Sequence, residues 1–428
     1  MTLNIQKLHR YSTNIAILLL SIFLSSCSYF SSPKSTVRAV TILGGLTAEQ
    51  KTELIAVLRP FEERTGIEIQ YEGATNSTTL LSSRVKAGNP PDIFVFPQPA
   101  LIADYAASGD LVPLTDFLDE RSLQQAYSDD WLALGSANGN VYALWYRAIV
   151  KGLVWYRPSV FEAKGYRVPT DWDDLLALSD QIVADEEFPW CLGLEGGEAT
   201  GWVGTDWIEA IMLRTADPEV YRQWANGELP FTAPQVVRAF NEFGTILRNS
   251  SYIEGGAFSA ITTPVEVSPL GLFDQPPSCY MHQQGSFISL FFPEGELVQA
   301  DYDVFLLPEI EPAFGTPVLV SGDAFAMFND TAEARQLMAY IATAEPHQTW
   351  AKQSGFISPH KAVSPTLYPN PVKQKIARIL FEADDIYFDA ADMMPNSVGL
   401  RPFWTGIVDF AAGKSAEDVT QTIDVERP

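Results

Sequence analysis

The hydrophobic positions from residue 39 onward alternate between strand-like runs and helix-like spacing. Residues 39–43 (AVTIL) are a short apolar run, which predicts a strand. The TAEQ sequence at 47–50 has the spacing of a capping box and predicts the start of a helix. The apolar face of this helix would be formed by residues spaced three and four apart, namely Leu54, Val57, Leu58 and Phe61. Residues 67–71 (IEIQY) then alternate between apolar and polar positions, as a second strand does.

A further helix and strand follow in the same order. The pattern predicts a helix over about 79–86 and a strand over 92–96 (DIFVF), which ends before two prolines. This strand–helix order favours a parallel sheet flanked by helices. Because ligands of such open sheets bind outside the carboxyl ends of the strands, the segments after the three strands are candidate ligand loops: 44–46, 72–76 and 97–99.

The alternation of helices and strands continues along the chain. The TDWD sequence at 170–173 predicts another capped helix, and a helix over about 331–344 follows a strand predicted at 323–328 (DAFAMF). The Pro-, Gly- and Ser-rich region 251–279 predicts connecting loops rather than a domain linker. These elements indicate an α/β fold.

The stretch GEATGWVGTDW at 197–207 sets two tryptophans among glycines and carboxylates. Because Gly, Thr and Asp offer little surface for packing around large rings, we predict a loop that displays Trp202. Trp207 leads the helix-like sequence WIEAIMLR and is predicted to lie in the core, as are Trp155 and Trp172. The alternative is that Trp202 and Trp207 both fill the core.

The composition favours a folded, acidic protein with room for two or three domains. The chain has 428 residues, 46% hydrophobic content and a formal net charge of −25. This charge repels phosphate backbones and anionic membrane surfaces, so nucleic-acid binding is not expected. His282, His347 and His360 lack metal-ligand spacing, and the chain contains no GxxxxGK[ST] phosphate loop. We therefore expect no metal, no other cofactor and no ATP binding.

The N-terminus predicts export. Lys7 and Arg10 precede the apolar run 15–24, which is too short to span a bilayer, and LSSC ends at Cys27. The pattern resembles a bacterial lipoprotein signal, with residues 1–26 removed, Cys27 lipidated and 27–36 forming a flexible, lipid-anchored tether. The alternative is plain secretion with Cys27 unmodified.

Export also affects whether the other two cysteines are oxidised. In an oxidising compartment, Cys191 and Cys279 have only each other as partners if Cys27 is lipidated, so we predict a disulfide between them. The alternative is a pair of buried free thiols.

Several short sequences occur in the order found in one protein family. They are FEERTG, IEIQYEG, VKAGNPPDIFVF, SGDLVPL, GNVYALWYRAIVKGLVWYRPSVFEAKGY, VFLLPEI and VSGDAFAMF. With the lipoprotein signal, they resemble the family 1 extracellular solute-binding proteins of ABC importers, over nearly the whole mature chain. FPQP, GTDWIE and CYMHQQGSFISLFFPEG are similar to α-glucoside binders of this group, which include proteins for glucosylglycerol, trehalose and sucrose.

The resemblance implies a two-lobed, type II periplasmic-binding fold with parallel-type sheets, helices around them and a ligand cleft between the lobes. Lobe one would comprise 37–147 plus 306–356, and lobe two 148–305 plus 357–428. The implied function is capture of a sugar by lobe closure and delivery to membrane permease subunits that a separate ATPase drives. The protein would be a monomer and not an enzyme, in the periplasm or at the cell surface.

The chemistry of a sugar indicates which residues to seek in the cleft. A pyranose offers an apolar face to an aromatic ring and a rim of hydroxyls to polar side chains. Position in the motifs selects the candidates Glu72, Asn76, Gln98, Trp145, Tyr146, Lys151, Trp202, Thr205, Asp206, Gly322, Asp323 and Arg401. Lys151 could instead be a solvated lysine and Asp323 a turn residue, and Asp92 is interpreted as a turn or capping carboxylate.

Two other functions remain open from the sequence. A secreted glycosidase would also carry aromatic rings and a carboxylate pair, such as Glu198 and Asp206. The same fold could bind a polyamine or a peptide, which the acidic charge permits. The resemblance and the tether favour a binding protein over an enzyme, and the number of tryptophans near the predicted cleft favours a sugar.

Overall fold

The computed structural model describes residues 38–46, 48–295, 301–353, 356–394 and 400–426. The predicted signal peptide, Cys27, the tether and Thr47 of the capping box lie outside these residues. From Val40 onward, the described residues form one compact unit. Within the described residues, no helix is both long and apolar enough to cross a bilayer.

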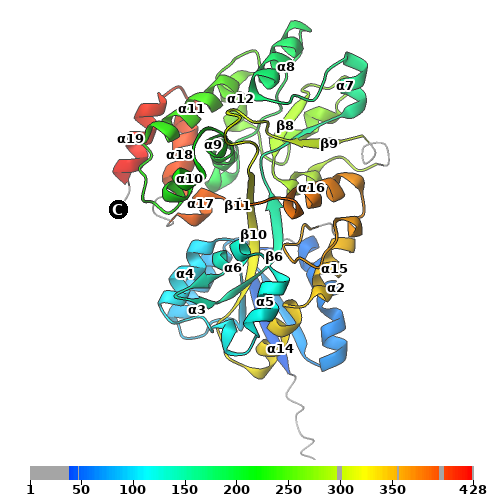
Figure 1. Ribbon diagram of the computed structural model, residues 1–428, viewed down its shortest axis with the longest axis vertical. Helices are drawn as coiled ribbons and strands as arrows, with labels where there is room; N and C mark the ends of the chain where they lie inside the picture. The colour runs from blue at the N-terminus through cyan, green and yellow to red at the C-terminus, as the bar shows by residue number, and fades with distance from the viewer. Residues whose placement is uncertain (1–37, 47, 296–300, 354–355, 395–399, 427–428) are drawn as a thin grey trace, which may run out of the picture. The chain divides into compact units, whose positions relative to one another are not determined.

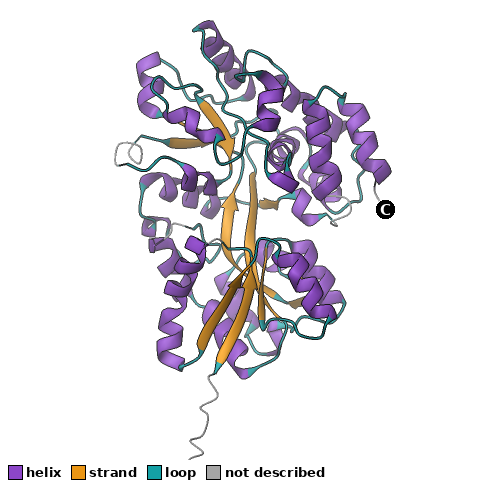
Figure 2. Ribbon diagram, turned by 180° about the vertical axis from the view of Figure 1, so that it is seen from behind, coloured by secondary structure: helices purple, strands orange, loops and turns teal. Residues whose placement is uncertain are grey.

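The first sheet has six strands and is flanked by helices (Figures 1 and 2). Its strands are β1 (Ala39–Gly44), β2 (Glu68–Gly73), β3 (Ile93–Phe96), β6 (Ala143–Val150), β10 (Val318–Met327) and β11 (Ile386–Phe388). The order is β11-β10-β3-β1-β2, and β6 pairs with β10. The β1–β3 and β10–β11 pairs are parallel, whereas β10 runs antiparallel to β3 and β6. The sheet is therefore mixed.

The helices around this sheet include the three predicted from the sequence, which begin at 47–50 and cover about 79–86 and 331–344. The helices of this sheet are α2 (Ala48–Thr65), α3 (Ser77–Lys86), α4 (Pro99–Ala107), α5 (Glu120–Ala126), α6 (Asp129–Leu134), α14 (Ala332–Ile341) and α15 (Ala344–Gln353). The predicted apolar face of α2 is buried, with Leu54 and Phe61 at 0% and 3% exposure. Thr331 caps α14 by accepting a hydrogen bond from the amide of Ala334. The Asp92 carboxylate accepts from the amide and hydroxyl of Thr41 on β1, 51 positions away, so its role is structural but is a link to another strand rather than the expected turn or cap.

Strands β6 and β10 form the longest ladder of the sheet, from the Ala143–Ala326 pair to the Val150–Val320 pair. The ladder shifts register between Asp323 and Ala324. At Gly322 a Cβ atom would lie 2.4 Å from the carbonyl oxygen of Arg147, so only glycine fits this close approach of the two strands.

The second sheet has three strands in the order β8-β7-β9. They are β7 (Leu153–Tyr156), β8 (Met281–Gln284) and β9 (Asp303–Leu306). Both pairings are antiparallel, so the prediction of parallel-type sheets is wrong here. A long helical segment joins β7 to β8, and the relative direction of strands so connected cannot be read from apolar runs.

The helices of the second half lie around and to one side of this smaller sheet (Figure 1). They are α7 (Pro158–Lys164), α8 (Trp172–Ala184), α9 (Trp202–Thr215), α10 (Pro218–Ala225), α11 (Pro234–Leu247), α12 (Gly256–Thr262), α16 (Pro371–Phe381), α17 (Ala390–Met393), α18 (Leu400–Ala411) and α19 (Ala416–Glu426). Of these, α11, α18 and α19 gather beside α9. The Asp171 side chain caps α8. The region predicted as loops between 251 and 279 contains α12 and a 3-10 helix at Ser268–Phe273.

The prediction of a loop at GEATGWVGTDW is wrong for its second half, because α9 already begins at Trp202. Gly204 lies inside this helix, and a Cβ atom there would be 2.4 Å from Cγ2 of Ile407 on α18. The glycine therefore permits close helix packing rather than a flexible loop. Trp207 is 1% exposed and stacks on Phe243, as expected for a core residue.

The predictions for the other tryptophans can be compared with their exposure. Trp155 and Trp172 are buried, with 1% and 5% exposure, which confirms their prediction as core residues. Trp202 is only partly buried. The alternative in which both tryptophans of the stretch fill the core is therefore not what the structure has.

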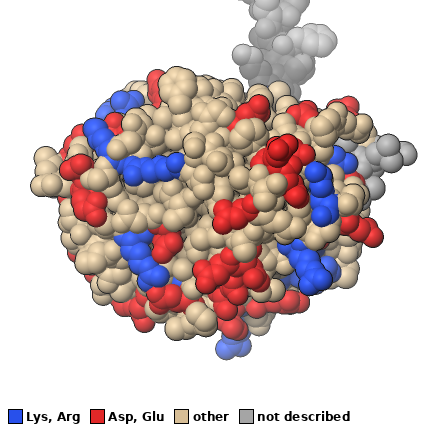
Figure 3. Space-filling model, turned by 90° about the horizontal axis from the view of Figure 1, so that it is seen from above, with Lys and Arg blue, Asp and Glu red and all other residues tan. Residues whose placement is uncertain are grey.

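Charged side chains of both signs are interspersed over the face shown in Figure 3. No continuous basic surface covers the described residues on this face.

Cys191 and Cys279 form the predicted disulfide, with Cα atoms 5.3 Å apart. Cys191 follows α8, and Cys279 precedes β8. The amide of Cys191 also donates to the carbonyl of Met281, so the covalent bond reinforces a contact that the backbone already makes.

Replacing Cys191 and Cys279 together by serine is expected to lower the free energy of unfolding by up to about 4 kcal/mol, because the bond restricts a long loop of the unfolded chain. Chemical denaturation of the exported protein measures the change. Adding reductant should shift the unmodified protein toward the double variant and leave the variant unaffected. An unchanged denaturation midpoint in the double variant would contradict a stabilising role for the bond.

Candidate functional site

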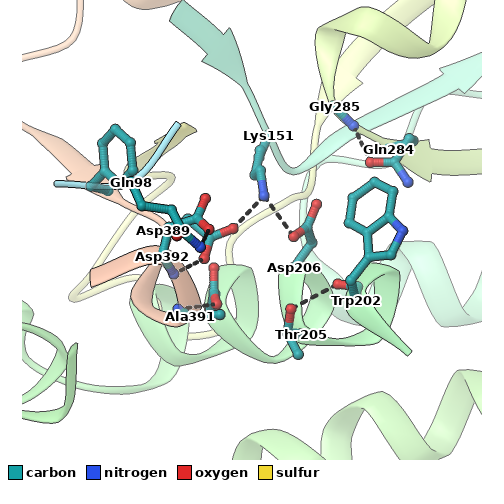
Figure 4. Close-up of polar contacts among 12 residues, drawn as sticks. Gln98, Lys151, Trp202, Thr205, Asp206, Gln284, Gly285, Asp389, Ala391 and Asp392 are labelled. Carbon is teal, nitrogen blue, oxygen red and sulfur yellow. Dashed lines mark hydrogen bonds and ion pairs between the residues drawn. The ribbon is translucent and has the colours of Figure 1, made fainter. Parts of the chain in front are cut away.

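One lysine and four carboxylates form a group where several elements meet (Figure 4), and all of them are buried except Asp392, which is partly exposed. We call it the Lys151 cluster, and it consists of Lys151, Asp206, Glu209, Asp389 and Asp392. Lys151 Nζ lies 2.8 Å from Asp206 Oδ1 and also hydrogen-bonds Asp389 Oδ2. These three residues are only 1% to 5% exposed. The ammonium is thus held between two carboxylates away from water.

Each member of the cluster is placed by its own local structure. Lys151 joins β6 to β7, and Asp206 and Glu209 lie one turn apart on α9. Asp389 caps α17, because its Oδ1 accepts a hydrogen bond from the amide of Asp392. Glu209 Oε1 accepts a hydrogen bond from the amide of Ala391, also in the first turn of α17. The first turn of α17 is therefore held by carboxylates of the cluster.

Burial dominates the protonation of the carboxylates. It raises the pKa of Asp206 to about 7 and that of Asp392 to about 8, and it holds the pKa of Glu209 well above its ordinary value. The charge of Asp389 adds to all three increases. For Lys151, burial opposes the charged form, but the surrounding carboxylates outweigh it and raise the lysine pKa well above its ordinary value.

Oxygen atoms of Asp206, Glu209 and Asp389 lie within 4.8 Å of one another, a spacing that could suit a metal ion. Lys151 Nζ already contacts two of these three carboxylates and supplies a positive charge there. We therefore assign no metal to the cluster. Asp206 Oδ2 and Glu209 Oε2 are buried and accept no hydrogen bond from the described residues.

An aromatic pair lies beside the cluster. Trp202 begins α9, one turn before Asp206, and its ring centroid is 5.8 Å from Lys151 Nζ. The ring of Phe287 is 6.0 Å from that of Trp202 and tilted by 36°. Trp202 and Phe287 are both partly exposed, so together they offer apolar ring surface to a ligand.

A second ion pair lies on the long ladder. Arg147 Nε of β6 is 3.1 Å from Asp323 Oδ2 of β10, and these side chains are 12% and 16% exposed. The guanidinium lies 4.8 Å above the ring of Phe356. Arg147, Phe287 and Phe356 line one small pocket, so this pair is joined to Trp202 through Phe287.

The Arg147–Asp323 pair also lies near the carboxyl end of β2. Burial, together with the charge of Asp323, raises the pKa of Tyr71 to about 12, and the Tyr71 hydroxyl accepts a hydrogen bond from the amide of Leu46. Leu46 follows β1, so polar groups gather at the strand ends where a ligand was predicted.

Four of the twelve predicted ligand residues join these groups. Lys151 and Asp206 belong to the cluster, Trp202 lies beside it, and Asp323 belongs to the second pair. Gln98 touches the cluster from another element, because its Nε2 lies 3.1 Å from Asp392 Oδ1.

Three further predicted residues are buried. Trp145 packs against neighbouring aromatic rings, and Tyr146 is stacked on Trp350, each with 1% exposure. The Thr205 hydroxyl, also 1% exposed, donates to the carbonyl of Trp202 within α9. Buried in this way, the three side chains offer almost no surface to a ligand.

The remaining predicted residues are accessible or carry no side chain. Glu72 is exposed and pairs with Arg84 at 2.7 Å, and Asn76 is exposed ahead of α3. Arg401 is 80% exposed and 4.0 Å from Glu198. Gly322 serves the strand contact described above. Ligand contact by these residues stays a prediction.

Several residues of these groups escaped the sequence patterns: Arg147, Glu209, Phe287, Asp389 and Asp392. Arg147 lies inside β6, where the apolar residues on either side hide it in the sequence. Asp389 follows the short strand β11 as a helix cap, a signal that could have been found. Glu209 is a charged residue inside an apolar helix, which the sequence shows. Its complete burial is seen only in the folded structure.

The pH dependence of stability follows from the sign of each pKa change. Asp392 titrates at about 8 here but at about 3.9 in an unfolded chain, so its contribution to stability is lost as pH rises through that window. Burial lowers the pKa of His282 to about 4 and that of His347 further still. The contribution of these histidines therefore grows with pH and is complete above about pH 6.5.

Between about pH 6.5 and about pH 8, the free energy of unfolding is accordingly expected to fall, because only the carboxyl contribution changes there. Urea denaturation across this interval measures it. The Asp392→Asn variant should show a smaller decrease, and the exposed Asp385→Asn variant should behave as the unmodified protein does. A stability that rises with pH over the interval would contradict this assignment.

The sequence is similar to a known family over most of its length. Residues 44–348 match the family described as bacterial extracellular solute-binding protein. The chain is 48% identical over 391 residues to the osmoprotective compounds-binding protein GgtB of Synechocystis sp., covering 91% of this chain and 93% of that protein. It is 42% identical over 390 residues to the alpha-glucosides-binding periplasmic protein AglE of Rhizobium meliloti, covering 89% and 85% of the two chains.

Solved structures of solute-binding proteins share the fold. The bacterial solute receptor AcbH superposes with a TM-score of 0.75 at 18% identity, covering 91% of this chain and 98% of that one. A chitin oligosaccharide binding protein gives a TM-score of 0.73, also at 18% identity, with 91% and 98% covered. This fold is the two-lobed type II periplasmic-binding fold that the sequence predicted. On the extent of the family match and the identity to both relatives, the chain belongs to the bacterial extracellular solute-binding protein family.

Proposed function

We propose that this protein captures an α-glucoside, such as glucosylglycerol, trehalose or sucrose, and delivers it to the permease subunits of an ABC importer. The observation that carries the proposal is the similarity over about nine tenths of the chain to two proteins named for osmoprotective compounds and for alpha-glucosides. A family of binding proteins, rather than enzymes, argues against the secreted glycosidase considered from the sequence.

The partly exposed rings support a sugar as the ligand. A pyranose places its C–H face on an aromatic ring, and Trp202 with Phe287 supplies such a surface. Arg147 lines one pocket with Phe287, and with its partner Asp323 it supplies a fork of donors and a pair of acceptors for hydroxyl groups. We place the sugar against these four residues.

The other predicted contacts divide by exposure. Asn76, Glu72 and Arg401 are accessible and remain candidates for the rim of the ligand. Trp145, Tyr146 and Thr205 are not included in the proposed contact set, because their side chains are buried in the core. Lys151 and Asp206 are assigned to the support of Trp202 rather than to the ligand, because they are paired with each other and almost inaccessible.

Transport requires that the ligand be enclosed and then released. In the proposed mechanism, lobe one (37–147 plus 306–356) and lobe two (148–305 plus 357–428) close over the sugar, and the permease recognises the closed form. We further propose that the mature protein is a monomer, tethered in the periplasm or at the cell surface by a lipid on Cys27. Mass spectrometry of membrane-extracted protein tests the lipid.

Glucosylglycerol, trehalose and sucrose, tested one by one in a thermal-shift assay, provide the direct test of the ligand class. At least one of them is expected to raise the melting temperature, because a ligand that binds the folded state stabilises it by mass action. Calorimetry then gives Kd, and chromatography of the recovered sugar should show it unchanged. A shift with spermidine or a peptide and with none of the sugars, or recovery of cleaved sugar, would overturn the proposal.

The Trp202→Ala variant is expected to weaken sugar binding roughly ten- to hundred-fold, because burial of a large apolar side chain contributes about 1.5 to 3 kcal/mol. Trp202→Phe should retain most of the affinity, since a ring remains. Asp323→Asn should weaken binding less than Trp202→Ala does, because the amide still accepts one hydroxyl.

Phe258→Ala is a matched control for loss of an aromatic ring, because Phe258 lies on α12 and is 76% exposed. Its Kd should equal that of the unmodified protein. Equal affinities for the Trp202→Ala and Phe258→Ala variants would remove Trp202 from the binding surface.

A further inference from the structure

A small pocket lies beside the aromatic pair of the proposed sugar surface. Its volume is about 20 Å³, and its lining includes Arg147, Phe287 and Phe356 together with two serines, Ser286 and Ser289. We call it the Ser286 pocket. All five residues are partly exposed, so the pocket is open to a ligand. Because roughly 10 to 15 Å³ suffices for one water molecule, the pocket has room for one small polar group.

Hydrogen bonds hold the turn that carries Ser286 to the pocket. Gln284 ends β8, and its Oε1 accepts from the amide of Gly285 at 2.7 Å (Figure 4). The amide of Val150, at the end of β6, donates to the Ser286 hydroxyl at 3.2 Å. Arg147 lies on the same strand. The serine hydroxyl and the guanidinium are therefore positioned by one element, β6.

The polar groups of the pocket are mainly hydrogen-bond donors. The Ser286 oxygen accepts from Val150, and since a hydroxyl also carries a hydrogen, that hydrogen remains to be donated. Asp323 lies beside Nε of Arg147, and no described residue accepts from Nη1 or Nη2 of this guanidinium. Ser289 Oγ is 3.5 Å from the Ser286 carbonyl, a long contact that it can give up for a ligand. An oxygen atom that enters the pocket would meet several donors.

Apolar surface accompanies these donors. Phe287 and Phe356 contribute their rings to the lining, and Ile149 and Leu290 contribute aliphatic side chains. The Arg147 guanidinium lies 4.8 Å above the centre of the Phe356 ring, which fixes the direction of its donors. The pocket therefore suits a group with one apolar carbon and one oxygen, and its volume admits little more.

The charges at the pocket favour a neutral group. Arg147 is already paired with Asp323 at 3.1 Å, and Lys373, which also lines the pocket, lies near the charge of Glu53. A carboxylate would have to compete with these two acidic side chains, and it carries one more oxygen than a hydroxymethyl group does. The chemistry therefore indicates a neutral hydroxyl on a short carbon arm.

We propose that the Ser286 pocket binds the hydroxymethyl group of a glucosyl unit whose ring lies on Trp202 and Phe287. Ser286 and Arg147 donate to its oxygen, and its carbon packs against the rings of the pocket. This inference rests on the proposed function, because a glucosyl unit is what the α-glucosides proposed as ligands share. It makes Ser286 a specificity-determining residue, since a ligand without this hydroxyl leaves the donors unpaired.

The test compares ligands that differ only at this group. Calorimetry gives Kd for whichever of glucosylglycerol, trehalose and sucrose causes the largest thermal shift, and for its derivative with every glucosyl unit 6-deoxygenated. The derivative is expected to bind roughly ten- to hundred-fold more weakly, because it leaves desolvated donors without an acceptor. A derivative whose glucosyl unit is oxidised to glucuronosyl should also bind more weakly than the parent sugar, since the pocket takes a neutral group.

The variant Ser286→Ala distinguishes a ligand contact from a merely structural role. It is expected to weaken binding of the parent sugar about two- to tenfold and to leave Kd of the 6-deoxy derivative nearly unchanged. If Ser286→Ala does not fold because the Val150 amide loses its acceptor, Ser289→Val narrows the same pocket and leaves that bond in place. It too should weaken the parent sugar more than the derivative. Ser251→Ala, which changes an exposed serine between α11 and α12, should bind both ligands as the unmodified protein does.

The outcomes distinguish the two proposals. Equal Kd values for the parent sugar and the 6-deoxy derivative, tighter binding of the glucuronosyl derivative, or equal weakening of both ligands in Ser286→Ala would overturn the pocket assignment and leave the proposed function intact. Failure of all three sugars to bind would overturn the proposed function, and the pocket assignment with it.

Discussion

The buried ammonium of Lys151 is the interaction on which the centre of the structure depends. It pairs with Asp206 and Asp389, and each of the three residues comes from a different part of the chain. Removing charges from water costs several kcal/mol per ion, and the attraction between partners offsets this cost only when the geometry is close. Loss of Lys151 would leave the buried carboxylates without their counterion. The connection from β6 to β7, the start of α9 and the turn after β11 are therefore held in one arrangement.

The elements around the Lys151 cluster are held in place by close backbone packing and by the disulfide. Strands β6 and β10 pair over their length, and Gly322 lets their backbones approach closely. On the other side, α9 packs against α18 through Gly204, and the disulfide holds the segment after α8 to the approach of β8. Rigid elements thus surround Trp202 and its partner Phe287. This arrangement suits a binding surface, because preorganised rings lose little freedom when a ligand arrives.

A solute-binding protein needs both residues that contact the ligand and residues that hold those contacts in place. A binding protein must hold its ligand firmly enough to collect it and loosely enough to release it. In the proposed site, the partly exposed rings and the partly buried ion pair would contact the ligand, whereas Lys151, Asp206, Glu209 and Asp389 are buried away from it. The cluster instead ties together the elements that carry those contacts. Support and contact are therefore separate tasks here, carried out by neighbouring residues.

The sequence alone predicted helices and strands well where apolar residues recur at a regular helix or strand spacing. The apolar faces of α2 and α14, strands β1 to β3, the capped helix α8, the cysteine pair and the buried Trp155, Trp172 and Trp207 all follow from local spacing or composition. Family motifs added the fold and directed attention to Trp202, Lys151, Asp206 and Asp323. These signals are readable because side-chain direction along a helix or strand depends only on nearby positions.

Only the tertiary structure decided which polar residues meet. Lys151 is 55 positions from Asp206 and 238 from Asp389, and no local period records such distances. For the same reason the sequence did not reveal Arg147 beside Asp323 on the opposing strand, nor the antiparallel second sheet. It also misplaced the start of α9, because the glycines that suggested a loop are required by packing against α18. Burial and charge balance arise from the assembled fold, and they set the protonation and the role of each carboxylate.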